Sequence, residues 1–149
     1  MPVSTEIMAL AAQALTAFQD GDDARGFAAL EEHVFAFAPQ LTAANPFEVA
    51  MVLAGVGKVL EAAGQFELAA LKYADAATYA EIREPGTVET AGDFADLADM
   101  LERVGDRAGA LHAVQRSAEH LKLAGIWEAR QAAYEERMAR LRADSEGTS

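Results

Sequence analysis

Hydrophobic residues along this chain recur every three or four positions, which is the spacing that places them on one face of an α-helix. In the first run, at about 5–19, this period is followed by Ile7, Leu10, Ala11, Ala14, Leu15 and Phe18. Comparable runs follow at about 23–37, 46–63, 66–82, 88–104, 107–122 and 126–142. Long alternating runs of Val, Ile and Thr, which would indicate strands, are missing from the sequence. The pattern therefore predicts an all-α protein whose helices are joined by short loops.

Polar residues mark where several of these helices should begin. Asn45 and Pro46 form the clearest start signal, because Asn is a good helix cap and Pro suits the first helical position. Thr87 is expected to cap the helix that starts at about 88. The aspartates beside Gly21 are expected to cap the helix after that glycine. These signals predict pairs of helices separated by tight turns.

Glycines in these turns recur at a nearly constant interval. Gly21, Gly64 and Gly105 are 43 and 41 residues apart, so the chain contains an internal repeat. The better copy surrounds Gly64, the next surrounds Gly105, and the copy at Gly21 is weaker. Repeats of this length indicate a helical array in which each helix pair packs on the next.

Within the two better copies, small residues stand on both sides of the turn and a larger residue follows. The copy around Gly64 carries Gly57, Ala69, Tyr73 and Ala76, and the copy around Gly105 carries Ala98, Ala110, Val114 and Ser117. Small residues allow two helices to cross closely, and the larger residue fills the gap at the next pair. The pattern resembles the tetratricopeptide repeat (TPR), in a long-period variant similar to the kinesin-light-chain type, since the usual repeat has about 34 residues.

The resemblance implies one domain at 1–149, a right-handed α-solenoid of tandem antiparallel helix hairpins. The expected parts are repeats at about 5–38, 46–83 and 87–123, a capping helix at about 126–142 and a disordered tail at 143–149. The capping helix should pack through a narrow apolar stripe of Trp127, Tyr134, Met138 and Leu141. A plain helical bundle with glycine turns is the alternative architecture.

The resemblance also implies a function, because the first helix of each hairpin in this family lines a concave groove. The groove residues are then Met8, Ala11, Leu15, Phe18, Met51, Ala54, Lys58, Glu61, Ala95, Asp99, Glu102 and Arg103. A groove that passes from apolar to acidic suits a peptide or partner helix with apolar and basic residues. We therefore expect a protein-binding scaffold or adaptor and not an enzyme. A small acidic secretion or assembly chaperone and a self-associating structural subunit, which would form homo-oligomers, are the alternatives.

Composition and charge restrict the partner further. The formal net charge of −12 disfavours nucleic acids and anionic membranes, although solubility alone would also explain it. The absence of cysteine excludes disulfides, zinc–thiolate sites and iron–sulfur clusters. No apolar run is long enough to span a membrane, and no basic segment precedes an apolar one at the start. We therefore expect a cytoplasmic protein without a signal peptide.

Residues that could carry chemistry are few. His112 and His120 lie about 12 Å apart along one helix, too far to share a metal ion, and His33 has adjacent acids that point elsewhere. No nucleotide-binding loop or nucleophile motif is present. We therefore expect no catalytic residue, no cofactor and no metal site. One helix face is expected to carry the carboxylates of Asp93, Asp96, Asp99 and Glu102. This face either binds a cation or a basic peptide or is simply solvated.

Overall fold

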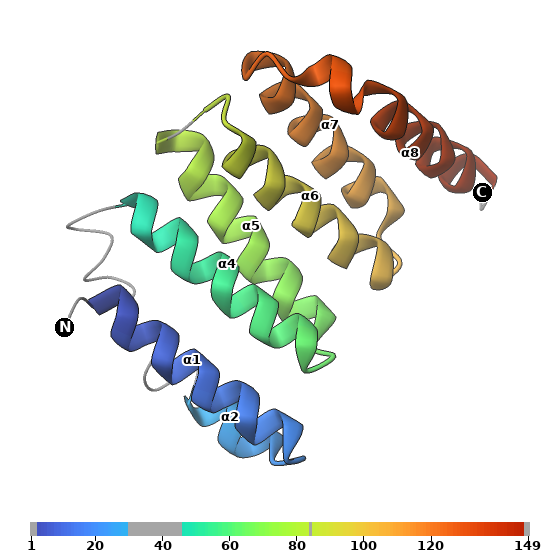
Figure 1. The fold of residues 1–149 in the computed structure, drawn as a ribbon. Helices are drawn as coiled ribbons and strands as arrows, with labels where there is room; N and C mark the ends of the chain where they lie inside the picture. The colour runs from blue at the N-terminus through green and yellow to red at the C-terminus, as the bar shows by residue number, and fades with distance from the viewer. Residues whose placement is uncertain (1–2, 30–45, 84, 148–149) are drawn as a thin grey trace.

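The computed structural model describes residues 3–29, 46–83 and 85–147, and every regular element among them is a helix (Figure 1). The helices are α1 (Val3–Gln19), α2 (Asp23–Ala29), α4 (Pro46–Ala62), α5 (Phe66–Arg83), α6 (Val88–Arg103), α7 (Arg107–Leu123) and α8 (Trp127–Gly147). The all-α prediction is confirmed for this part of the chain. Within it, each helix is too short or too polar to cross a membrane.

Most helix ends lie close to the expected ones, and α8 is the main exception. It continues to Gly147, although a disordered tail was expected from 143. No glycine or proline occurs between Gly125 and Gly147, so nothing in the local sequence stops the helix earlier. The end of the second expected helix at about 37, His33 and the cap at Asn45 lie outside the described residues.

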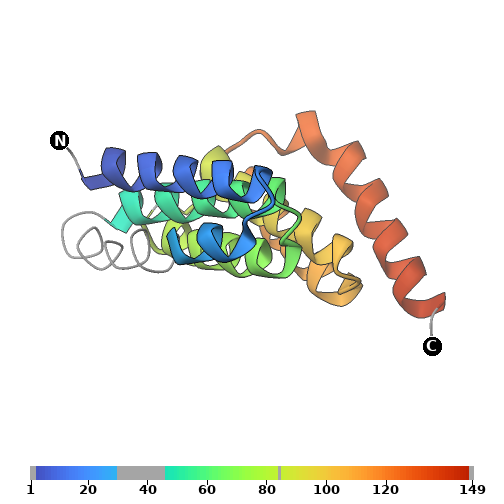
Figure 2. The ribbon, with the colours of Figure 1, turned by 90° about the horizontal axis from the view of Figure 1, so that it is seen from below.

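Helices α4 to α8 lie side by side in chain order, and α1 lies between α2 and α4 (Figure 1). The extensive contacts of α1 are with α2 and α4, and further contacts join α4 to α5, α5 to α6, α6 to α7 and α7 to α8. Figure 2 shows α8 inclined to the other helices. All of these contacts except that of α1 with α4 join helices that are neighbours in the described chain, and α1 and α4 are separated by α2.

Left-handed glycines close the turns, as the repeat predicted. Gly21, Gly64 and Gly105 have φ values of 81°, 78° and 86°, a conformation that costs other residues energy because of their Cβ. After Gly64, the Gln65 N–H donates to the Leu60 carbonyl at 2.8 Å, which completes a common helix C-terminal motif. Side-chain oxygens of Asp22, Thr87 and Asp106 cap α2, α6 and α7, and the expected cap at Thr87 accepts from the Thr90 N–H at 3.2 Å.

Small residues lie where paired helices approach each other. A Cβ added at Gly57 on α4 would lie 2.9 Å from the ring of Tyr73 on α5, so the absence of a side chain makes room for the tyrosine. Tyr73 is fully buried, and its hydroxyl donates to the Glu61 carboxylate at 2.9 Å. Ala69 and Ala110, at matching places in two helix pairs, have no exposed surface. Close helix approach therefore stabilises both pairs.

Helix α8 covers the pair formed by α6 and α7. Its residues Tyr134, Met138 and Leu141 pack on a small-residue cluster of Ala98, Ala110, Ala113 and Val114. The Ser117 hydroxyl donates to the Ala91 carbonyl at 2.7 Å and lies 2.8 Å from the Tyr134 hydroxyl, so α6, α7 and α8 share one hydrogen-bond chain. Trp127 makes an edge contact with Tyr134, with ring centroids 5.7 Å apart. The predicted packing of this helix is confirmed for Tyr134, Met138 and Leu141, whereas Trp127 contacts Tyr134 and Lys122 and is not part of the cluster.

Candidate binding cleft between α4 and α6

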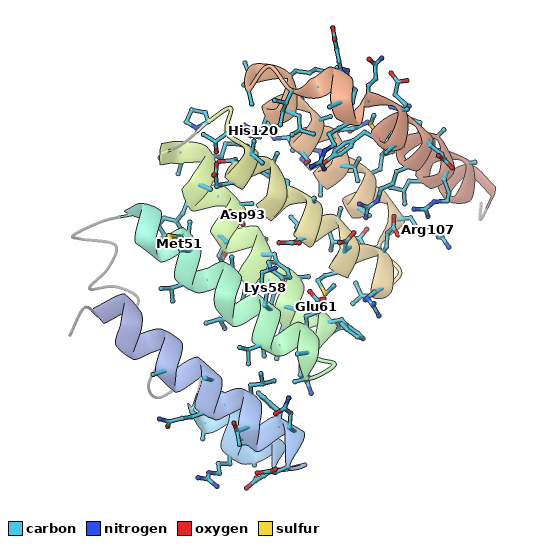
Figure 3. All side chains as sticks on the ribbon, in the orientation of Figure 1. Met51, Lys58, Glu61, Asp93, Arg107 and His120 are labelled. Atoms are coloured by element: carbon cyan, nitrogen blue, oxygen red, sulfur yellow. The ribbon has the colours of Figure 1, made fainter. Side chains whose placement is uncertain are left out.

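A cleft of about 550 Å³ lies between α4 and α6, with α5 contributing Ala80. Its lining residues are Ala50, Met51, Ala54, Gly55 and Lys58 from α4, Ala80 from α5, and Glu89, Gly92, Asp93 and Asp96 from α6. The residues from each helix recur every three or four positions, so each helix presents one face to the cleft. Figure 3 shows Met51 and Lys58 on α4 and Asp93 on α6 around this region. The volume suits a few side chains of a ligand.

Apolar and small residues form much of the lining. Met51 is 60% exposed, which is high for a large apolar side chain beside a cleft. Its unbranched thioether can adapt to differently shaped apolar partners. Ala54 and Gly55, one turn along α4, keep the wall low beside it. This side of the cleft is therefore suited to an apolar side chain.

Gly92 leaves the backbone of α6 open to the cleft. Glycine inside a helix costs about 0.5–1 kcal/mol relative to alanine, so an interior glycine invites a structural reason. Gly57 and Gly26 have such a reason. An added Cβ would lie 2.9 Å from the Tyr73 ring at Gly57 and 2.7 Å from the Phe18 ring at Gly26. At Gly92 an added Cβ would meet nothing within 4 Å among the described residues. Packing within that part of the protein therefore does not require this glycine.

Carboxylates occupy the α6 side of the cleft. Lys58 Nζ lies 3.7 Å from Asp96 Oδ2, and no salt bridge in the described part of the chain reaches Asp93 or Glu89. Burial and, to a smaller extent, the charge on Asp96 together raise the pKa of Asp93 to about 7, although Lys58 acts in the opposite direction. Burial also raises the pKa of Asp96, again against the effect of Lys58. The α6 wall therefore carries more negative charge than Lys58 of the opposite α4 wall neutralises.

A second depression, of about 400 Å³, is lined by Glu61, Asp99, Met100, Glu102 and Arg103. Two of its carboxylates are already paired with α8. Arg137 Nη2 lies 2.7 Å from Asp99 Oδ1, and Arg137 Nε and Arg140 Nη2 donate to Glu102 at 3.2 and 3.1 Å. Asp99 and Glu102 are therefore attachment points of α8, a role that differs from the expected one in a groove.

The expected groove residues are thus distributed over several places. Met51, Ala54 and Lys58 line the cleft, and Glu61, Asp99, Glu102 and Arg103 line the second depression. The expectation for Phe18 is wrong, because this residue is only 8% exposed and its ring packs against Gly26 in the core. Leu15 and Ala95 are half-buried and line neither hollow. The side chains of Met8 and Ala11 lie outside the described part of the protein.

Seven cleft residues were not foreseen as groove positions: Ala50, Gly55, Ala80, Glu89, Gly92, Asp93 and Asp96. The α6 residues that reach the cleft, Glu89, Gly92, Asp93 and Asp96, begin one to two turns before the expected Ala95 and Asp99. Asp93 and Asp96 had been singled out only as part of a carboxylate row. The sequence signal that could have located this wall is Gly92 inside a predicted helix, with Glu89 three positions before it and Asp93 directly after it.

A buried histidine forms the other conspicuous polar cluster. The His120 Nδ1 accepts from the Gly86 N–H at 2.9 Å, so the ring proton is assigned to Nε2, which lies 2.9 Å from Glu81 Oε2. The ring stacks on Phe94 with centroids 5.6 Å apart, and Arg116 pairs with Glu81. Burial opposes ionisation of Glu81, but the hydrogen bonds from His120 and Arg116 outweigh it and lower its pKa. With 3% exposure, His120 fixes the α5–α6 connection against α7 and does not face a ligand.

Comparison of this chain with protein-family models, with curated proteins and with solved structures finds no match. No relative therefore indicates a ligand or a family. The geometry and charge of the cleft between α4 and α6 are the basis for a functional assignment.

Proposed function

We propose that this protein is a TPR-like interaction scaffold that binds a peptide or partner helix in the cleft between α4 and α6. The observation that carries the proposal is the pairing of two unlike walls across one cleft. Met51 is exposed on the α4 wall, and Asp93 and Glu89 lie on the α6 wall without a salt bridge among the described residues. A ligand that is apolar on one side and basic on the other would complement both walls.

The two walls would contribute differently to binding. Apolar contacts at Met51 and Ala54 would be desolvated in the complex and would mainly set the dissociation rate. The carboxylates would accelerate encounter with basic partners and repel acidic ones, in keeping with the net charge of −12. The cleft would thus select partners by charge and retain them by apolar contact.

A right-handed α-solenoid of antiparallel hairpins is the architecture that we propose for this scaffold. It is supported by the repeated left-handed turn glycines and by the contacts between helices that are neighbours in the described chain. In such an arrangement α4 and α6 would be the first helices of successive hairpins and would line the concave face. The absence of cysteine suits a reducing compartment such as the cytoplasm.

Site-specific photo-crosslinking tests the proposal. We would place p-benzoylphenylalanine at Met51, and separately at Leu71 as a control, since Leu71 is 59% exposed on α5 and does not line the cleft. We expect a discrete crosslinked partner from position 51 only, and its loss when Gly92→Phe fills the cleft. Equal crosslinking from both positions, or a crosslink that survives Gly92→Phe, would refute the assignment of this cleft.

A further inference from the structure

Carboxylates recur at every third position of α6, at Asp93, Asp96, Asp99 and Glu102. Most of this row is paired with cations of the same chain. Lys58 approaches Asp96 to 3.7 Å, and Arg137 and Arg140 of α8 bind the two carboxylates nearest the end of α6. At the other end, Asp93 and the preceding Glu89 have no such pairing in the described part of the chain.

Helix α8 shows what kind of element this row already binds. It places Arg137 and Arg140 on the carboxylates while Tyr134 and Met138 of the same helix pack on the apolar cluster beside them. An arginine-bearing amphipathic helix is therefore complementary to the α6 surface at one end. Each of these arginine contacts joins residues more than 30 positions apart, so they are tertiary contacts and not local ones.

The open end of the row combines the same two features within the cleft. Asp93 and Glu89 supply negative charge, and Met51 and Ala54 supply an apolar wall opposite them. Gly92 lies between the acids and has free space at its Cβ position, so another helix could approach the α6 backbone closely there. An extended peptide would not need this close approach.

We infer that the cleft accepts a basic amphipathic helix of the partner, with an arginine or lysine on Asp93 and an apolar side chain on Met51. The inference rests on the proposed function, which it makes more specific. The cation would neutralise a carboxylate that is held in a partly buried position beside Asp96 and Glu89, with Lys58 as the cation that faces it from α4. Binding should therefore favour ionised Asp93 and release part of a proton near neutral pH.

Three synthetic peptides test the inference. The first is an alanine-rich helical peptide with leucine and, one turn later, arginine. The second replaces arginine with citrulline, its uncharged isostere, and the third keeps leucine and arginine but contains prolines that prevent a helix. Binding is followed through the backbone amide signals of Gly92, Asp93 and Ala54 by nuclear magnetic resonance, with labelled wild-type protein.

We expect the helical arginine peptide to bind about fivefold more tightly than the citrulline peptide, as for a partly screened ion pair. The difference should vanish in Asp93→Asn and persist in the control Asp75→Asn, which alters an exposed carboxylate of α5 outside the cleft. Equal binding of the arginine and citrulline peptides would overturn the role of Asp93. Equal binding of the proline-containing peptide would overturn the helical occupant.

Failure of all three peptides to shift the cleft amides would also overturn the inference. It would not by itself overturn the proposed function, because photo-crosslinking at Met51 detects any occupant of the cleft, whatever its charge or conformation. A crosslink at position 51 together with no preference for arginine would leave the scaffold in place and assign the cleft to an uncharged ligand.

Discussion

Alanine substitutions at Gly57 and Gly92 should change the stability of this protein in opposite directions. Both glycines lie inside helices, so in each case alanine removes the cost of fixing a glycine backbone, about 0.5–1 kcal/mol. The surroundings differ. A new Cβ at Gly57 would lie 2.9 Å from Tyr73 Cε1, whereas at Gly92 it would meet no described atom within 4 Å.

The size of each effect follows from these surroundings. Tyr73 is fully buried and its hydroxyl is bonded to Glu61, so the ring cannot move away without disturbing the core. Overpacking of this kind costs about 1–3 kcal/mol, more than the helix gains. We therefore expect Gly57→Ala to destabilise the protein by about 1–2 kcal/mol. Gly92→Ala should stabilise it by about 0.5–1 kcal/mol.

Urea unfolding followed by far-ultraviolet circular dichroism measures both effects, provided that wild type and variants share one slope against urea concentration. A lower midpoint for Gly57→Ala and a higher one for Gly92→Ala are expected. If Gly57→Ala were stabilising, the close contact between α4 and Tyr73 would be wrong. If Gly92→Ala were destabilising, Gly92 would be packed against some other part of the chain and the cleft would not be open there.

Three further predictions follow from the same structure. The pKa of Asp93 rises from 3.8 to about 7 on folding, so the folded state retains a proton that the unfolded state has lost, and stability should fall as pH rises through this window. The full pKa shift would correspond to at most about 4 kcal/mol of stability, which partial exposure of Asp93 reduces to about 1–2 kcal/mol. Asp93→Asn should therefore raise the melting temperature at about pH 8 and change it little at about pH 4. An equal effect at the two pH values would contradict the raised pKa of Asp93. Ala69→Leu and Ala110→Leu should each cost about 1–3 kcal/mol in urea unfolding, and unchanged midpoints would show that these crossings are loosely packed. Arg137→Gln combined with Arg140→Gln should accelerate hydrogen exchange in α8 more than in α4 or α5, and uniform exchange would show that these ion pairs do not hold α8.

The helices themselves could be predicted because their signals are local. Hydrophobic period, caps and turn glycines act within one or two turns, and Gly64 and Thr87 adopt the roles that their neighbours in sequence indicate. The place of Tyr73 differs from the expected one: the residue was expected to fill the gap at the next helix pair, but its ring lies against Gly57 of its own pair. The end of α8 could not be predicted, because the polar residues after Arg142 favour neither helix nor coil strongly.

The binding surface was harder to predict because it depends on how each helix is rotated and on distant contacts. Periodicity places Phe18 on an apolar face but does not say whether that face meets the core or a groove. Rotation of α6 about its own axis decides whether the expected Ala95 or the observed Gly92 and Asp96 face the cleft. The partner of Asp99 is Arg137, on a helix 38 positions away, and no local pattern connects the two.

The central claim is that the cleft between α4 and α6 binds a partner, and calorimetric titration with the crosslinked partner segment tests it most directly. Wild-type protein would be compared with Gly92→Phe, which places a ring in the cleft from a position where an added Cβ meets nothing within 4 Å among the described residues. The control is Ala132→Phe, which adds the same ring at an exposed position of α8. We predict that Gly92→Phe weakens binding at least about tenfold while Ala132→Phe binds as wild type does. Wild-type affinity for Gly92→Phe, with its circular dichroism spectrum unchanged, would contradict the claim.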